Sequence, residues 1–139
     1  MSTETNKAIV RRYFEEVHNQ GKREVLKEIA VEDYVEHSPF PGQEQGLKGF
    51  QQRVEILQTA FTMNFTLEDM IAEGDRVVVR WTNHNVHHGP FMGIPATGKS
   101  AIVSGINIYL LRNGKLAENW DVFDALSLFQ QLGTFPQPH

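Results

Sequence analysis

The hydrophobic period of the chain changes near residue 61, and this change limits the fold more than any other feature. Before it, apolar residues recur every three or four positions, which is typical of amphipathic helices. The strongest such stripe contains Leu47, Phe50, Val54, Leu57 and Phe61. After it, apolar and polar residues alternate in several runs, which predicts strands. Helices followed by an antiparallel meander predict an α+β fold, with the helices packed on one face of a curved sheet.

Helices and strands can be placed along the chain from this pattern. The predicted helical segments are 7–20, a shorter one at 25–29, and 47–61, with a turn-rich loop at 38–42. Thr3 or Thr5 is available as the N-cap of the first helix, and Gly21 ends it. The predicted strands begin near Phe65 and then cover 76–88, 101–111 and 115–123, before a short helix at 125–132.

Length and composition exclude several classes of protein. The 139 residues make one domain, spanning 1–139, with 13 basic against 17 acidic residues and a net charge of -4. No basic stripe is present, so nucleic acid is not an expected partner. The chain has no Cys, which removes disulfides, thiolate metal sites and cysteine nucleophiles. No apolar run approaches the ~20 residues of a membrane span, and we expect a soluble, cytoplasmic protein.

The last predicted hairpin turns at Asn113-Gly114 and allows two registers. A two-residue turn places Asp121 opposite Ile106, which buries a charge in an apolar layer. A turn with a left-handed bulge at Gly114 places Asp121 opposite Gly105. We adopt the second register because it sorts the two strands into consistent faces.

One of these faces is mixed and the other almost wholly apolar. The mixed face carries Val103, Gly105, Asn107, Tyr109, Ala117, Asn119, Asp121 and Phe123. The apolar face carries Ile102, Ile106, Ile108, Leu110, Leu116, Trp120 and Val122. We expect Gly105 to leave open volume across from Asp121, so the mixed face is the predicted pocket floor. The helices can cover only one face, and the apolar one is predicted to pair with a second subunit in a homodimer.

Asp121 is the candidate acid and base, although it could also be an exposed carboxylate at the end of a strand. Its sequence neighbours are apolar or aromatic, which indicates a buried position. Burial would raise the pKa of the carboxyl group toward the range useful for taking a proton next to a carbonyl. Asn107 and Asn119 on the same face would orient or polarise that carbonyl. Asp124 falls on the other face and is predicted to cap the last helix.

Neither a metal nor a nucleotide is expected to bind. His84, His87 and His88 resemble a zinc site, but they lie on a predicted strand, where His87 points away from the other two. His84 and His88 are then ~13 Å apart, too far for one zinc. The segment 93–99 resembles a phosphate loop, yet it joins two strands and no helix follows it.

Several spaced motifs resemble those of the SnoaL-like ester cyclases. They are AEGDRV at 72–77, HHGPFMGIPATGK at 87–99, NGKLAENWD at 113–121 and QLG at 131–133. The resemblance covers nearly the whole chain and implies a nuclear transport factor 2-like cone, commonly a homodimer, with a pocket inside. It also implies ring closure by an intramolecular aldol reaction without a cofactor, and the acid/base Asp of the family is Asp121 by position. Related cyclases carry Gln and His on the facing strand where this chain has Gly105 and Asn107, so an imidazole relay is missing there.

The resemblance adds further residues to the predicted pocket. His87 matches the motif histidine of the family, although a structural bond to a loop carbonyl is an equal possibility, and His37 falls where the family often has a polar pocket residue. Tyr13 and Phe91 are expected to line the cavity by analogy with the fold. The predicted substrate-binding set is Asn107, Asn119, His87, His37, Tyr13, Phe91, Trp81, Gly105 and Tyr109, with no metal ligands.

The function predicted from these observations is acid/base chemistry on a small, mostly apolar, carbonyl-bearing substrate, without a cofactor. One alternative is a non-catalytic protein of the same fold that binds a small ligand, and another is an isomerase or hydrolase of the same superfamily. A third is an interaction module without a pocket, which a covered Gly105 would favour.

Overall fold

The computed structural model describes residues 2–134. Its helices are α1 (Thr3–Arg12), a π-helix (Tyr13–Asn19), a 3-10 turn (Arg23–Val25), α2 (Leu26–Ile29), α3 (Gly46–Ala60) and α4 (Ala125–Gln131). Its strands are β1 (Ala30–Glu36), β2 (Phe61–Glu73), β3 (Arg76–His87), β4 (Ser100–Arg112) and β5 (Lys115–Phe123). The α+β prediction is confirmed.

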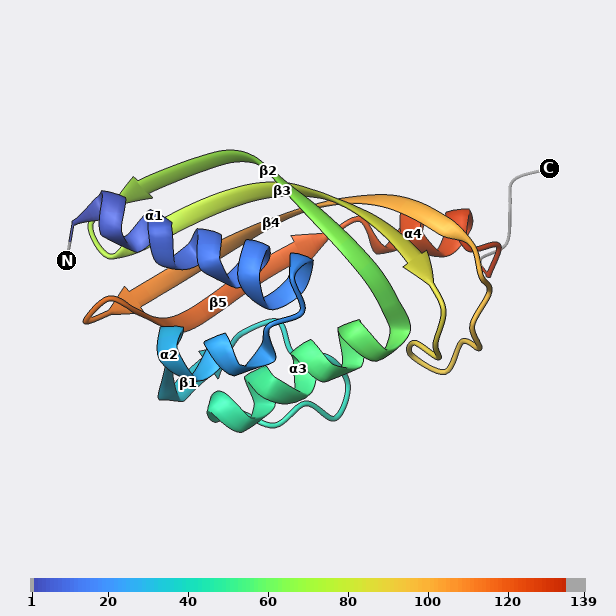
Figure 1. The fold of residues 1–139 in the computed structure, drawn as a ribbon, viewed down its shortest axis with the longest axis horizontal. Coiled ribbons are helices and arrows are strands. Elements are labelled where there is room, and N and C mark those ends of the chain that lie inside the picture. The colour runs from blue at the N-terminus through green and yellow to red at the C-terminus, as the bar shows by residue number, and fades with distance from the viewer. Residues whose placement is uncertain (1, 135–139) are drawn as a thin grey trace.

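The strands form one curved sheet in the order β1-β5-β4-β3-β2 (Figure 1). Strands β2 to β5 are the predicted antiparallel meander, and α1 and α3 lie on its concave side. Strand β1 was not predicted, and it pairs in parallel with β5 at the sheet edge. Its burial alternates at Tyr34 and Glu36, and the buried glutamate hides this strand from a search for alternating apolar residues.

The element boundaries differ from the predictions in a few places. The N-cap of α1 is Ser2, whose Oγ accepts a hydrogen bond from the Thr5 amide at 3.0 Å, and not Thr3 or Thr5. After Arg12 the predicted helix widens into the π-helix. Phe61, predicted as the last residue of a helical stripe, begins β2. The N-cap of α4 is confirmed, since Asp124 Oδ1 accepts a hydrogen bond from the Ser127 amide at 3.0 Å.

The register of the last hairpin differs from both alternatives. Asn113 and Gly114 have φ of 53° and 74°, which makes a two-residue turn. Ala117 is then an extra residue on β5, because Leu111 pairs with Leu116 and Leu110 with Glu118. The bulge shifts the rest of β5 by one position, and Asp121 lies opposite Asn107, not Gly105 or Ile106.

The faces of the hairpin were nevertheless assigned correctly for most residues. The observed register differs from the adopted one by two residues, and a shift by two leaves every side chain on its own face. Leu116 is the exception, because the bulge places it in the core, where it is fully buried. The convex face exposes Ile102, Ile106 and Val122, with exposed fractions of 55%, 42% and 71%.

Within residues 2–134, no helix is both long enough and apolar enough to cross a membrane.

Candidate active site

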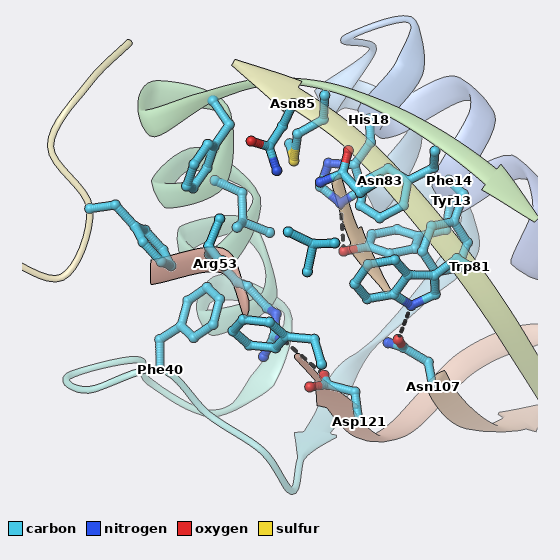
Figure 2. A pocket seen from close by; sticks show the side chains of 18 residues that line it. Tyr13, Phe14, His18, Phe40, Arg53, Trp81, Asn83, Asn85, Asn107 and Asp121 are labelled. Carbon is cyan, nitrogen blue, oxygen red and sulfur yellow. Dashed lines mark hydrogen bonds and ion pairs between the residues drawn. The ribbon is translucent and has the colours of Figure 1, made fainter. Parts of the chain in front are cut away.

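A pocket of about 70 Å³ lies between the concave face of the sheet and the helices (Figure 2). Its walls are mostly aromatic and aliphatic: Tyr13, Phe14, Phe40, Leu57, Phe61, Met63, Phe65, Trp81, Phe91, Val103, Phe123 and Leu128. Six polar side chains complete the lining: His18, Arg53, Asn83, Asn85, Asn107 and Asp121.

Asp121 reaches the pocket from β5 and is almost completely buried, with 6% of its side chain exposed. Its Oδ2 atom accepts a hydrogen bond from Arg53 Nη2 at 2.8 Å and from Asn119 Nδ2 at 2.7 Å. Within residues 2–134, both side-chain hydrogen bonds to this carboxylate converge on Oδ2. Oδ1 therefore remains available to a bound molecule.

Arg53 is the charged partner of Asp121, and the sequence analysis missed it. It lies on α3 between Phe50 and Val54, on the apolar stripe of that helix. A charged residue on a buried stripe is the signal that could have found it. Its guanidinium packs over the Phe40 ring at 4.2 Å from the centroid. Burial alone would lower the pKa of Arg53, but the nearby Asp121 and Glu36 carboxylates raise it above its usual value.

Glu36 forms a second carboxylate layer behind Arg53. Its Oε1 atom lies 3.3 Å from Arg53 Nη1, an ion-pair contact without hydrogen-bond alignment. Its Oε2 atom accepts hydrogen bonds from Asn119 Nδ2 at 2.8 Å and from the Ser38 amide at 3.0 Å. Burial raises the pKa of Glu36, and the Arg53 charge opposes this shift. The Arg53 guanidinium thus forms ion pairs with two buried carboxylates, those of Asp121 and Glu36.

The amides of Asn107 and Asn119 are fully occupied within the protein. Asn107 Oδ1 accepts from Trp81 Nε1 at 2.7 Å, and its Nδ2 donates to Asn119 Oδ1 at 3.0 Å and Tyr109 Oη at 3.1 Å. Asn119 Nδ2 donates to both Glu36 and Asp121. With both amide hydrogens of each residue engaged, this network positions Asp121 and has no donor left to polarise a substrate carbonyl.

Gly105 is not beside open space, which corrects the predicted pocket floor. A Cβ atom at this position would lie 2.1 Å from Trp81 Cζ2 and 2.6 Å from Cη2. The missing side chain makes room for the indole, and the pocket lies beyond it, against Trp81 itself. Covering Gly105 therefore does not remove the pocket.

Two of the predicted histidines lie outside the pocket. His37 stacks on Trp120, with 4.3 Å between ring centroids, and its Nε2 lies 2.8 Å from Glu118 Oε1. Because Trp120 belongs to the convex face, His37 does too. His87 is fully buried, and its Nδ1 accepts from the Thr97 amide at 3.2 Å, which fastens the loop between β3 and β4. Residues 2–134 contain no group of three or more His, Asp or Glu side chains that could hold a metal ion.

The other predicted residues divide in the same way. Asp121, Asn107, Tyr13, Trp81 and Phe91 line the pocket, whereas Asn119, Tyr109 and Gly105 lie behind its wall. Three polar lining residues besides Arg53 were not predicted: His18, Asn83 and Asn85. The two asparagines interrupt a row of buried apolar residues on β3, and such an interruption is a signal for a polar pocket wall.

The fold and this pocket define the chain as a small α+β cone with a buried carboxylate. A family model for SnoaL-like polyketide cyclases matches residues 8–132, and the chain belongs to that family. The aklanonic acid methyl ester cyclase DnrD of Streptomyces peucetius is 32% identical over 99% of this chain and 97% of its own length. DauD of Streptomyces sp. (strain C5), named for the same activity, is 32% identical over 94% and 83%. The solved structure of TsrD from Streptomyces laurentii matches with a TM-score of 0.87 and 29% identity, covering 97% of this chain and 99% of that one.

Proposed function

We propose that this protein is a cofactor-independent cyclase that works in the cytoplasm and closes a ring in a small, mostly apolar, carbonyl-bearing substrate. The observation that carries the proposal is the Asp121 carboxylate, which lines an aromatic pocket with Oδ2 held by two donors and Oδ1 left to a ligand. A carboxylate held in one orientation is suited to general acid/base work.

The proposed step is an intramolecular aldol reaction. Asp121 Oδ1 takes a proton from a carbon next to a carbonyl, which breaks a C–H bond and gives an enolate. The enolate carbon attacks a second carbonyl of the same molecule, which forms the C–C bond of the ring and an alkoxide. The alkoxide takes the proton back from Asp121, so the reaction needs no other reactant.

Arg53 is the group suited to stabilising the negative charge that develops on the substrate. It lines the pocket, and its charge is secured by two carboxylates. The carboxylate becomes neutral when it takes the proton, and the Arg53 charge then acts on the enolate oxygen in a water-poor site. This assigns to Arg53 the role that Asn107 and Asn119 were predicted to have.

A ring-bearing substrate requires the pocket to widen. The cavity of about 70 Å³ is smaller than the roughly 150 Å³ of a cavity that holds benzene. Phe40 and Phe91 come from loops and contact each other with 5.8 Å between ring centroids, while Phe91 also packs on Phe61 at 5.0 Å. Displacement of these two loop rings is the change that admits a substrate with least cost to the core.

Turnover of aklanonic acid methyl ester, the compound named for two relatives, tests the proposal. Asp121→Asn keeps the shape of the side chain and removes the base, so kcat should fall about 100-fold or more, while ligand affinity stays within about threefold. Asp124→Asn is the matched control, because that carboxylate caps α4. Full turnover in Asp121→Asn would disprove the acid/base role. Ligand binding without turnover in the wild-type protein would instead favour the non-catalytic alternative.

We also propose that the protein is a homodimer joined through the convex face. Ile102, Ile106 and Val122 are exposed there, next to the partly buried Ile108 and Trp120. Adjacent apolar side chains on two paired strands form a patch that a monomer would leave in water. A twofold axis through this face would leave both pockets, on the concave sides, open to substrate.

A further inference from the structure

The pocket has a second polar end, remote from Asp121. Figure 2 shows His18, Asn83 and Asn85 together at one end and Asp121 with Arg53 at the other. The strand register agrees with this view, because Asn107 pairs with both Asp121 and Val79. Asn83 and Asn85 lie four and six residues further along β3 than Val79, or about 13 and 20 Å of strand.

His18 reaches this end because of the π-helix. Residues five apart on a regular α-helix point about 140° away from each other. The wider turn of the segment Tyr13–Asn19 brings Tyr13 and His18 to the same side, where His18 Nε2 lies 2.8 Å from Tyr13 Oη. Such π-helical turns are rare and occur often at functional sites. The His18 ring also packs 5.3 Å from Phe65, which pairs with Asn83.

Two polar atoms at this end are buried without a partner. Among residues 2–134, His18 Nδ1 and Asn85 Oδ1 have no hydrogen bond, and the two residues are only 6% and 5% exposed. Asn83 differs, since its Oδ1 accepts a hydrogen bond from the Asn64 amide at 3.2 Å. Buried polar atoms are nearly always paired. Five other buried side-chain atoms of residues 2–134 are also unpaired, but only His18 and Asn85 among these residues line the pocket, where a ligand group can complete them.

We propose that His18 and Asn85 form a subsite for a hydroxyl group at the end of the substrate remote from the reacting carbonyl. A hydroxyl both donates and accepts, so it suits the side-chain amide of Asn85 and the imidazole of His18, each of which both donates and accepts. Burial lowers the pKa of His18 to about 3, with a smaller contribution from the Arg53 charge, so the subsite is neutral and suits an alcohol or phenol rather than an anion. This inference rests on the proposed function, because it names the class of substrate: an elongated, apolar molecule with a hydroxyl at one end and a carbonyl at the other.

Phenol and toluene test the subsite directly, because they differ by a hydroxyl in place of a methyl group. Dissociation constants are measured by protein-observed NMR for the wild-type protein and for Asn85→Leu, Asn83→Leu and Asp121→Asn. The affinity ratio of phenol to toluene should fall about tenfold in Asn85→Leu and change less than twofold in Asp121→Asn. In protein whose histidines are labelled with ¹⁵N, phenol but not toluene should shift the Nδ1 resonance of His18. That resonance is identified because it is absent from the spectrum of His18→Gln.

The stability of the variants without ligand provides an independent measurement. Asn85→Leu removes an unpaired polar atom and should raise the Tm, whereas Asn83→Leu removes a hydrogen bond that the protein uses and should lower it. A lower Tm in Asn85→Leu would mean that Asn85 is structural and would overturn the proposal. So would an unchanged phenol preference in that variant, or the absence of saturable phenol binding at His18. If the preference for phenol over toluene were lost in Asp121→Asn alone, the hydroxyl would bind at the other end of the pocket. Failure of the acid/base proposal is distinguishable from this result, because it would appear only as full turnover by the Asp121→Asn variant.

Discussion

Replacing Gly105 by alanine should damage both the fold and the pocket, although the residue is small and lies within a regular strand. The added Cβ would lie 2.1 Å from Trp81 Cζ2, and three indole atoms lie within 2.7 Å. The ring must retreat by about 1.4 Å to reach an ordinary carbon contact of ~3.5 Å. It cannot do so freely, because Trp81 Nε1 donates to Asn107 Oδ1 at 2.7 Å.

The cost can be estimated from two effects. Overpacking of a core typically costs about 1–3 kcal/mol, and a buried hydrogen bond broken on one side costs about 1–3 kcal/mol more. We therefore expect Gly105→Ala to lower the free energy of unfolding by about 3 kcal/mol, which lowers the Tm by roughly 10 °C in a chain of this size. The measurement is thermal and urea denaturation followed by circular dichroism.

A double-mutant cycle with Trp81→Phe tests the assigned cause. Phenylalanine lacks the outer ring edge that meets the new Cβ, so Gly105→Ala should cost at least ~1 kcal/mol less in the Trp81→Phe background. An equal cost in both backgrounds, or a Tm within about 2 °C of the wild-type value for Gly105→Ala, would refute the reasoning. Gly105 would then be a site of backbone flexibility and not a space reserved for the indole.

Three further predictions concern charge, assembly and pH. Arg53→Met leaves two buried carboxylates without a cation and should lower the free energy of unfolding by ~3 kcal/mol or more. This loss of stability should become smaller between pH 7 and 5, because burial already raises the pKa of Glu36 and protonation removes its charge. Arg80→Met, which breaks an exposed ion pair with Asp69, should cost under ~1 kcal/mol, and an equal cost in both variants would contradict this account. In sedimentation, Ile106→Glu on the convex face should give monomers or aggregates and Leu126→Glu on α4 should not; unchanged dimers in both would exclude this face as the interface. The pKa of His18 is lowered to about 3 against an ordinary value near 6.5, so its contribution to stability is complete above pH ~6.5 and is lost as the pH falls, by up to ~1.4 kcal/mol per unit. His18→Phe should flatten this acid limb in urea titrations at pH 4–7, and an unchanged slope would show that the imidazole does not carry it.

Features of the fold and the site could be predicted where their signal lies within one short stretch of sequence, and could not where it depends on residues far apart in the chain. The meander and α3 could be predicted because period and turn residues are local properties, and the faces of β4 and β5 could be assigned because an error of two residues preserves them. The partners of Asp121 could not be predicted from the sequence. Arg53 is 68 positions away and Glu36 lies on a parallel edge strand, so their meeting depends on how α3 crosses the sheet. The prediction of open volume beside Gly105 was wrong because a missing side chain suggests empty space in the sequence. In the structure, a tryptophan on the neighbouring strand fills that space.

Gly105 and Asn107, the two positions at which the sequence analysis expects related cyclases to carry Gln and His, are coupled in this structure. Gly105 admits the Trp81 indole, and the indole nitrogen fixes Asn107. Asn107 in turn donates to Asn119, which holds Oδ2 of Asp121. A glutamine at 105 would displace the indole, and a histidine at 107 could not both accept from Trp81 and donate to two partners with one neutral ring. Gly105 and Asn107 therefore act together as one alternative support for the Asp121 carboxylate. Introducing glutamine at 105 alone, or histidine at 107 alone, should displace this carboxylate more than introducing both together with a smaller residue at 81.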